Sequence, residues 1–407
     1  MPINLHRRLL AITFIESFAT ILVERGLYFL TSKRLGFSEA ANLWLAMVFG
    51  LAYAVGALLS NRLTGPLRER GLLMAALIGA MLTHSLMGLA PTTAMMFAGG
   101  VAIAFMSGAK WPVIESFISA GLTPRQQAGA VGRFNIAWAT AVPLSLLVTG
   151  PLTHHSVWAL FALAVAMNIV SLAMVWPLPS QPVHLPNDHP DRLDPSQLRR
   201  LGRLLLASRY LMILSYATMQ IIAALIPFIF ESLNVDVRIS AGLSGLLDAV
   251  RLIAFLVLGA WTAWHGRRTG LVISLIALPA SFAVILAGHD LVSVLGAEIV
   301  FGLAAGTVYY AALYYAMVER NASVHASGAH EGLIGAGFAA GPGLMLLGRA
   351  IGPKVGGPTA GMALGVAPVV LLCCGGAAAA LVQAGPVPSP LEAQPARSYS
   401  DKSTSDA

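Results

Sequence analysis

The chain alternates between long apolar segments and short polar ones. A helix that crosses a lipid bilayer needs about 20 consecutive apolar residues. Such segments occur twelve times, at residues 9–30, 42–60, 71–90, 93–120, 131–150, 157–176, 208–230, 241–264, 270–288, 291–318, 329–350 and 362–383. The pattern predicts an all-α polytopic membrane protein with twelve transmembrane helices.

One long polar segment divides the twelve apolar segments into two groups of six. Residues 177–207 are rich in proline and arginine and follow the sixth segment. After the twelfth segment the chain is rich in Pro, Ser and Asp, a composition typical of disorder. We expect an N-terminal six-helix half at 1–176, a cytoplasmic linker at 177–207, a C-terminal six-helix half at 208–383 and a disordered cytoplasmic tail at 384–407.

The composition excludes most other classes of protein. Hydrophobic residues make up 57% of the 407 positions and charged residues only 11%, whereas soluble domains have about 25% charged residues. The two cysteines, Cys373 and Cys374, are adjacent within an apolar segment, which favours packing over a disulfide or a metal site. We expect neither a metal nor a cofactor.

Basic residues lie between the apolar segments. The net charge of +7 could indicate nucleic acid, but the basic residues form no cluster with interleaved aromatic residues, so we expect no nucleic acid partner. With both termini inside, the inner segments hold 17 Lys and Arg residues and the external loops hold 4. Because cytoplasmic loops carry the excess of Lys and Arg, both termini are predicted to be cytoplasmic.

The two halves carry an internal repeat. The glycine-to-proline interval 129–143 in the fifth segment matches 328–342 in the eleventh, at an offset of 199 residues. The same offset places Lys110 over Tyr309. Duplicated halves of this kind are typical of secondary transporters, which bind substrate between the repeats.

Two loops follow variants of the motif G-x-x-x-D-R-x-G-R-R. The loop at 259–268 keeps the final Gly-Arg-Arg but has Ala263 at the aspartate position, and the loop at 56–62 has Ser60 there. With the twelve segments and the linker, this motif resembles that of the major facilitator superfamily over residues 1–385. The resemblance implies two six-helix halves in which helices 1, 4, 7 and 10 line a pathway and helices 3, 6, 9 and 12 support it from outside.

Charged residues inside apolar segments indicate where a cavity lies, because a charge in a bilayer is costly unless it is paired or faces water. The candidates singled out are Glu16, Glu24, Arg25, Lys110, Glu115, Asp248, Arg251 and Glu298. The stretch from Glu24 to Phe29 is similar to the E-x-x-E-R-x-x-Y-Y signature of proton-dependent oligopeptide transporters, with Ile21 in place of the leading glutamate. This likeness implies a proton-sensitive first helix.

Lys110 lies near the predicted bilayer midplane and is followed by Trp111. It could hold an anionic group of a substrate, or it could form a structural ion pair between helices. Glu16 and Glu115 have similar predicted depths, so either could alternate between a proton and the Lys110 ammonium group, or could pair with it statically.

The other charged candidates have simpler explanations. Asp248 and Arg251 are three residues apart and can pair on one helix face. Glu24 and Arg25 point in different directions and need separate partners. Glu298 shares a helix face with Tyr309, eleven residues later.

Polar and aromatic residues complete the predicted pocket. Buried phenols seek hydrogen-bond partners, and their rings can stack on a substrate. We therefore expect substrate contacts from Lys110, Trp111, Tyr309, Tyr310, Gln220 and Asn135. Tyr310 could instead belong to an aromatic belt at the cytoplasmic interface.

These observations favour a secondary active transporter of a small organic solute. The sequence has no nucleotide-binding motif, so coupling to protons is expected. It has no convincing catalytic set, so we expect no catalytic residue and no enzyme activity. The alternative is a transporter-like sensor or assembly protein that binds a ligand without moving it. We expect the protein to be a monomer in the lipid bilayer of a cell membrane, namely the bacterial inner membrane.

Overall fold

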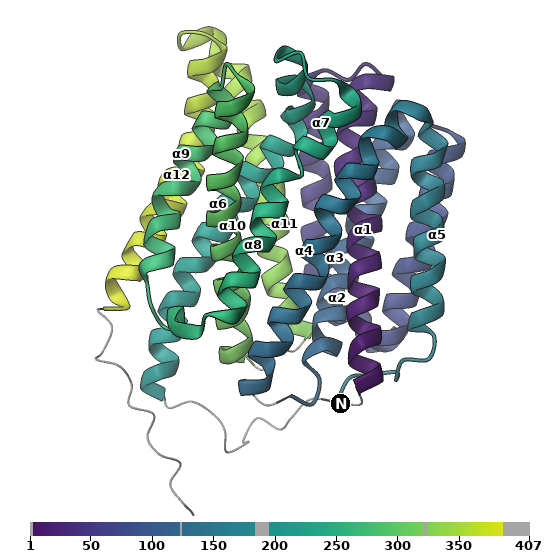
Figure 1. The fold of residues 1–407 in the computed structure, drawn as a ribbon, viewed down its shortest axis with the longest axis vertical. Helices are drawn as coiled ribbons and strands as arrows, with labels where there is room; N and C mark the ends of the chain where they lie inside the picture. The colour runs from purple at the N-terminus through teal and green to yellow at the C-terminus, as the bar shows by residue number, and fades with distance from the viewer. Residues whose placement is uncertain (1–2, 123, 184–194, 321–323, 386–407) are drawn as a thin grey trace, which may run out of the picture.

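The computed structural model describes residues 3–122, 124–183, 195–320 and 324–385 as a bundle of helices (Figure 1). The helices are α1 (Ile3–Arg34), α2 (Glu39–Leu89), α3 (Thr93–Ser119), α4 (Pro124–His155), α5 (Val157–Val175), α6 (Pro195–Ser232), α7 (Val237–Leu243), α8 (Leu246–Ala260), α9 (Thr269–Ala287), α10 (Leu291–Arg320), α11 (Val324–Ile351) and α12 (Pro358–Gln383). The predicted all-α fold is confirmed. Part of the predicted linker and nearly all of the predicted tail lie outside the described residues.

Ten helical spans within the described ranges are long and apolar enough to cross a membrane, with α7 and α8 together forming one of them (Arg238–Ala260), which confirms a polytopic membrane protein. Helix α1 is not one of the ten, because Glu16, Glu24 and Arg25 interrupt its apolar stretch. Helix α2 contains both the second and the third predicted segments. The predicted number of twelve separate helices is therefore not matched one to one.

Helix α2 is a helical hairpin rather than a straight rod. Its 51 residues would span about 76 Å at 1.5 Å per residue, against about 30 Å for a bilayer core. At Arg68 the backbone leaves the helical conformation, with φ 57° and ψ 168°. Gly56 and Gly79 lie on either side of this bend, yet they approach Phe105 and Met106, which are consecutive residues of α3. The two arms therefore run in opposite directions, which gives each predicted segment its own crossing.

Two helix boundaries differ from the prediction. Helix α6 begins at Pro195, inside the predicted linker, because its first turns are amphipathic: Leu204 and Leu205 are buried while Arg203 is exposed. The eighth predicted segment is divided between α7 and α8, which are separated by Ser244 and Gly245.

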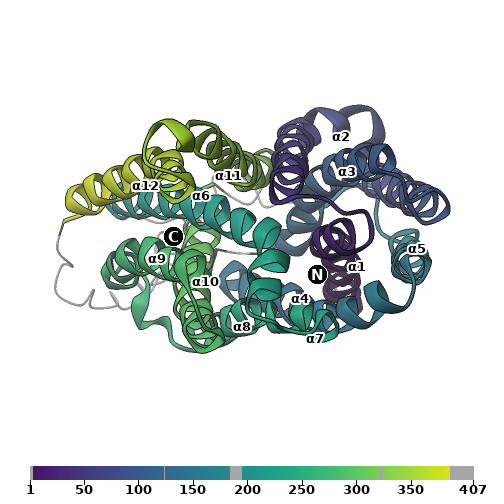
Figure 2. The same ribbon diagram turned by 90° about the horizontal axis from the view of Figure 1, so that it is seen from above.

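The helices form two groups around a central line. Seen from above, α1, α2, α3 and α5 gather on one side, and α6, α9, α10, α11 and α12 gather on the other (Figure 2). Helices α4, α7 and α8 lie where the two sides meet. The start of α1, the start of α6 and the end of α12 lie at the same end of the molecule (Figure 1). We call α1–α5 the N-terminal group and α6–α12 the C-terminal group; the domain boundaries themselves stay a prediction.

Glycines let the two groups approach each other closely along α2 and α11. A Cβ atom at Gly50 of α2 would collide with the backbone of α11 at Phe338 and Ala339. A Cβ atom at Gly335 of α11 would collide with the backbone of Ala54 on α2. Small residues at such positions allow tight helix packing in a membrane, and here they fix one side of the central cavity.

Candidate functional site

A cavity of about 120 Å³ lies between the N-terminal and C-terminal groups. This is roughly ten times the space that one buried water needs. Its lining residues are Ser17, Thr20, Ile21, Glu24, Arg25, Tyr28, Tyr53, Trp111, Phe134, Trp138, Val142, Tyr216, Met219, Gln220, Asp248, Arg251, Tyr309, Glu331, Ile334 and Phe338. Within the described part of the chain, α5, α9 and α12 contribute no lining side chain. These helices are the sixth, ninth and twelfth predicted segments, which the resemblance places outside the pathway.

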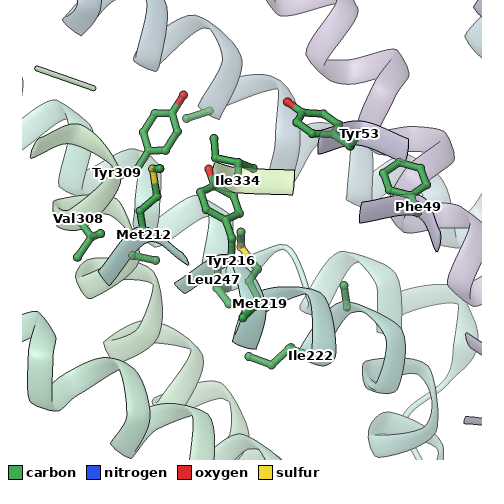
Figure 3. Close-up of a cluster of buried hydrophobic side chains, with 14 of the residues drawn as sticks. Phe49, Tyr53, Met212, Tyr216, Met219, Ile222, Leu247, Val308, Tyr309 and Ile334 are labelled. Carbon is green, nitrogen blue, oxygen red and sulfur yellow. The ribbon is translucent and has the colours of Figure 1, made fainter. Parts of the chain in front are cut away.

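Aromatic side chains supply eight of the 20 lining residues, so an occupant of the cavity would meet several ring faces. Figure 3 shows part of this wall, where Tyr53, Tyr216 and Tyr309 direct their hydroxyl groups toward the same side of the cluster. Tyr309 was predicted as a pocket residue from its place in the repeat. Nothing in the sequence indicated that Tyr53 and Tyr216 would be pocket residues.

The Arg251 guanidinium group is enclosed by aromatic rings. Its central carbon lies 4.8 Å from the ring centre of Trp138, 5.3 Å from those of Tyr216 and Tyr309, and 5.8 Å from that of Phe255. Arg251 Nη2 also donates a hydrogen bond of 2.7 Å to the Tyr216 hydroxyl. The cavity wall therefore already stabilises one cation by contact with ring faces.

Asp248 joins the two groups of helices through two arginines. One carboxylate oxygen lies 3.5 Å from Arg25 Nη1 on α1, and the other lies 3.6 Å from Arg251 Nη1 on its own helix. The predicted pairing of Asp248 with Arg251 is therefore present. The sequence did not predict that Arg25 finds its partner across the cavity.

Lys110 and Glu16 form a buried ion pair inside the N-terminal group. Lys110 Nζ lies 2.7 Å from Glu16 Oε2 and donates a second hydrogen bond of 2.9 Å to Thr20. Asn168 of α5 donates to Glu16 at 3.3 Å, and Asn168 Oδ1 lies 3.0 Å from His84 Nδ1. Lys110 and Glu16 do not line the cavity, but Thr20 does. The network therefore touches the cavity wall through Thr20.

Glu331 is a cavity residue that the sequence analysis missed. Its Oε2 atom accepts a hydrogen bond from the Tyr53 hydroxyl, which links α11 to α2. The Glu115 carboxylate of α3 interacts with Glu331, and both of its oxygens are buried without a well-formed hydrogen bond. The available signal was a carboxylate within the segment 329–350, but Glu331 stands close to the boundary of that segment.

The remaining cavity candidates are Trp111 and Gln220, and both line it. Gln220 Nε2 donates a hydrogen bond of 2.7 Å to the Tyr28 hydroxyl, so this contact also joins the two groups. The Trp111 ring centre lies 5.4 Å from Lys110 Nζ. Trp111 therefore lies close to the buried ion pair and also lines the cavity.

Asn135 and Tyr310, which were predicted to contact substrate, do not line the cavity. Asn135 is fully buried and accepts a hydrogen bond of 3.1 Å from Trp138 Nε1. It therefore orients a lining residue. The Tyr310 hydroxyl lies against Gly132 of α4, where a Cβ atom would be only 3.0 Å away.

Glu24 and Glu298 also have carboxylate oxygens that are buried without a hydrogen bond. Glu24 lines the cavity, and its Oε1 atom is buried without a hydrogen bond. Glu298 is fully buried on α10, outside the cavity lining, and neither of its oxygens has a hydrogen bond. Arg25 and Asp248 are the charged groups that act on Glu298.

Contacts between the two groups occur on both sides of the cavity. Toward the end of α1, Lys33 lies 2.8 Å from Glu231 of α6, and Arg349 of α11 pairs with Glu39 of α2. Toward the other end, Tyr310 packs on α4, and Gly328 of α11 packs on the backbone of α2. Contacts between the two groups therefore bound the cavity both toward the end of α1 and toward the opposite end of the molecule.

The loop after α8 carries the variant motif and is held by aromatic rings. His265 stacks on Tyr314 with ring centres 4.2 Å apart and an angle of 12° between the rings. The Trp264 ring packs edge-on against Tyr314 and Tyr315, and the Gly266 amide donates to the Tyr315 hydroxyl at 3.2 Å. Burial lowers the pKa of His265 below its ordinary value. These contacts lie within the C-terminal group, so they anchor the loop without the family's aspartate.

Solved transporters share this fold. The human organic anion transporter MFSD10 (TETRAN) superposes with a TM-score of 0.63 and 14% identity, covering 93% of this chain and 100% of that one. A mutant of the nucleoside transporter NupG gives 0.65 and 16%, covering 94% and 99%. A bacterial homologue of the human lysosomal transporter Spinster, in an inward-facing and unoccupied conformation, gives 0.61 and 15%, covering 94% of each chain. At these identities the likeness concerns the fold.

The family is shown by the sequence itself. No curated protein matches the chain. The sequence profile of the Major Facilitator Superfamily matches residues 9–353, a range that includes the cavity, the buried ion pairs and both variant loops. The chain belongs to the Major Facilitator Superfamily.

Proposed function

We propose that the protein is a secondary active transporter that moves a small organic solute by alternating access. The observation that carries this proposal is the central cavity, which is lined by charged and aromatic side chains from both groups of helices. Solute sites of secondary transporters lie in this position, between the repeated halves and near the bilayer midplane.

Alternating access requires that contacts on one side of the cavity break while those on the other side hold. Both sets of contacts exist here. Lys33–Glu231 and Glu39–Arg349 close one side, and the packing of Tyr310 on α4 closes the other. Exposed ion pairs are worth about 0.2–1 kcal/mol each, so the first set can open at little cost.

We propose protons as the coupling ion. The supporting observation is the number of carboxylates at or near the cavity that are buried (Glu16, Glu115 and Glu331) or half-buried (Glu24). Glu16 holds the Lys110 ammonium group directly, and Glu115 meets Glu331 where α3 packs on α11. Protonation of Glu16 would remove its attraction to the Lys110 ammonium group. Protonation of Glu115 or Glu331 would remove the repulsion between two carboxylates inside the helix bundle.

We also propose that the protein works as a monomer in a cell membrane, the bacterial inner membrane, with both termini in the cytoplasm. The excess of Lys and Arg in the inner segments supports this orientation. The start of α1 and the end of α12 share one end of the molecule (Figure 1).

The test is uptake by purified protein reconstituted into liposomes. Metabolites and drugs are first screened for thermal stabilisation of the protein, and those that stabilise it are tested with and without an imposed pH gradient. We expect at least one compound to accumulate when the gradient is present and to equilibrate when it is absent. Compounds that bind with no movement across the membrane would contradict transport and favour the sensor alternative.

A further inference from the structure

The charge balance of the cavity wall indicates the kind of solute that it binds. We propose that the occupant is a small organic cation that carries an aromatic ring or a quaternary ammonium group, with Glu24 as its counter-ion. This inference rests on the proposed function, because the occupant would be the transported solute.

The cavity wall has more carboxylates than cations. Glu24, Asp248 and Glu331 line it, against the guanidinium groups of Arg25 and Arg251. Asp248 lies within 3.6 Å of Arg251 and 3.5 Å of Arg25. Both cations of the wall therefore share one carboxylate, so with all three carboxylates ionised a monovalent cation would balance the charge of the wall.

Glu24 has one carboxylate oxygen that accepts no hydrogen bond. Glu331 has the Tyr53 hydroxyl as a donor, but Glu24 Oε1 is buried without a hydrogen bond. Lys110, Ser107 and Arg25 act on the Glu24 carboxylate from nearby, but Lys110 is bound by Glu16 at 2.7 Å. A buried acceptor without a donor is unfavourable, so a cationic occupant that reaches Glu24 gains a strong interaction.

The aromatic wall is suited to the same kind of occupant. The ring faces of Trp138, Tyr216 and Tyr309 already hold the Arg251 guanidinium group at 4.8–5.3 Å. Trp111, Tyr28 and Tyr53 line the cavity from α3, α1 and α2. Aromatic side chains arranged in this way recognise quaternary ammonium groups through cation–π attraction.

An anionic occupant fits less well. The Arg251 guanidinium group is surrounded by rings and donates to Tyr216 at 2.7 Å, and Arg25 is directed to Asp248. An anion would have to displace Asp248 from both arginines and then lie close to Glu24. The like charges would repel each other within a buried site.

The test uses three single-ring probes of opposite or no charge. Benzyltrimethylammonium is a permanent cation, benzyl alcohol is neutral and phenylacetate is an anion. Their binding to the full-length purified protein is measured by calorimetry at about pH 9.5, because a buried glutamate can need a pH above about 8–9 to be ionised. We expect the cation to bind best, and Glu24→Gln to weaken it at least about tenfold while leaving the neutral probe unchanged.

Asp236→Asn is the matched control. It removes one carboxylate charge from an exposed helix cap, and asparagine caps a helix equally well. This variant should bind the cation like the wild type. Equal or tighter binding of phenylacetate, unchanged cation binding by Glu24→Gln, or no cation binding at millimolar concentration would each overturn the proposal.

A second measurement does not depend on the folding of the variant. Dicyclohexylcarbodiimide reacts with carboxyl groups in apolar surroundings, and mass spectrometry locates the modified residue. In the wild-type protein, benzyltrimethylammonium should protect Glu24 from modification, and phenylacetate should not. If the cation does not protect Glu24, the cation proposal fails. If the same protein still transports another solute under a pH gradient, the proposed transport function stands.

Discussion

The Tyr53 hydroxyl on α2 donates a hydrogen bond to the Glu331 carboxylate on α11, across the line where the two groups of helices meet. Both residues line the cavity and are almost fully buried. The glycines of α2 and α11 bring the two backbones together on either side of this contact. The bond therefore links the cavity wall, the packing of the two groups and a buried carboxylate.

Replacing Tyr53 with phenylalanine should destabilise the protein by about 1–3 kcal/mol, because the buried Glu331 carboxylate loses a donor while the ring packing remains. Thermal denaturation of the purified protein measures the change. Tyr210→Phe is the control, because it removes a hydroxyl from a half-buried tyrosine outside the cavity. Equal melting temperatures for the two variants would argue against the bond.

Asp248→Asn should cost more than Arg25→Gln. The first change removes the carboxylate that two buried guanidinium groups share, and breaking a buried ion pair costs about 3–5 kcal/mol. The second change leaves Asp248 with Arg251 at 3.6 Å. Denaturation of both single variants and the double variant gives the coupling energy between Arg25 and Asp248. Strictly additive effects would mean that the contact across the cavity is not formed.

The fold was readable from the sequence because each apolar segment is long and the polar breaks are short. The exceptions are places where a break is itself helical. Residues 61–70 continue the helix on both sides of Arg68, so α2 spans two predicted segments. The amphipathic turn at Leu204 and Leu205 likewise extended α6 into the predicted linker.

The site was only partly readable. The similar predicted depths of Lys110 and Glu16 indicated that they could pair, and the spacing of three residues indicated the same for Asp248 and Arg251. Both pairs are present in the structure. Contacts between distant helices, such as Arg25 with Asp248 and Tyr53 with Glu331, depend on how the two groups dock. No spacing within one helix encodes that arrangement.

The protein should lose stability as the pH falls below about 6.5, in part through His265. Burial places the pKa of His265 below its ordinary value, whereas the unfolded chain has the usual pKa of about 6.5. The unfolded chain therefore binds the proton more readily, and the contribution of His265 is complete above that pH and declines below it. Denaturation midpoints measured between pH 5 and 8 report this dependence.

His265→Phe keeps a ring against Tyr314 but cannot titrate, so it should flatten the dependence on pH. The control is His289→Phe, which changes an exposed histidine and should leave the wild-type slope. An unchanged slope for His265→Phe would show that other groups cause the loss of stability.

The topology predicts opposite labelling of two exposed serines. Ser180 follows α5 at the end of the molecule where α1 begins, and Ser232 ends α6 at the other side. With Cys373 and Cys374 replaced by alanine, a cysteine at position 232 should react with an impermeant maleimide in intact cells. A cysteine at position 180 should react only after lysis, and the reverse pattern would invert the orientation.

The ion pair of Lys110 and Glu16 should be needed to couple transport to protons. Glu16→Gln imitates the protonated carboxylate, so it should abolish accumulation driven by a pH gradient while solute exchange without a gradient continues. Lys110→Ala should abolish transport in a protein that still folds; misfolding would instead indicate a structural pair, because Glu16 is then left buried without its cation at 2.7 Å.

Glu115→Gln is the informative comparison, since Glu115 was an equal candidate but has no contact with Lys110 and meets Glu331 instead. Reconstituted wild-type and variant proteins are compared for gradient-driven uptake and for exchange of labelled solute. Loss of accumulation in Glu16→Gln alone assigns coupling to the Lys110 pair, because only that variant breaks it. Loss in Glu115→Gln alone assigns coupling to the carboxylates between α3 and α11. If both variants accumulate solute like the wild type, neither residue carries the proton, and Glu24, Asp248 and Glu298 are the carboxylates to replace next.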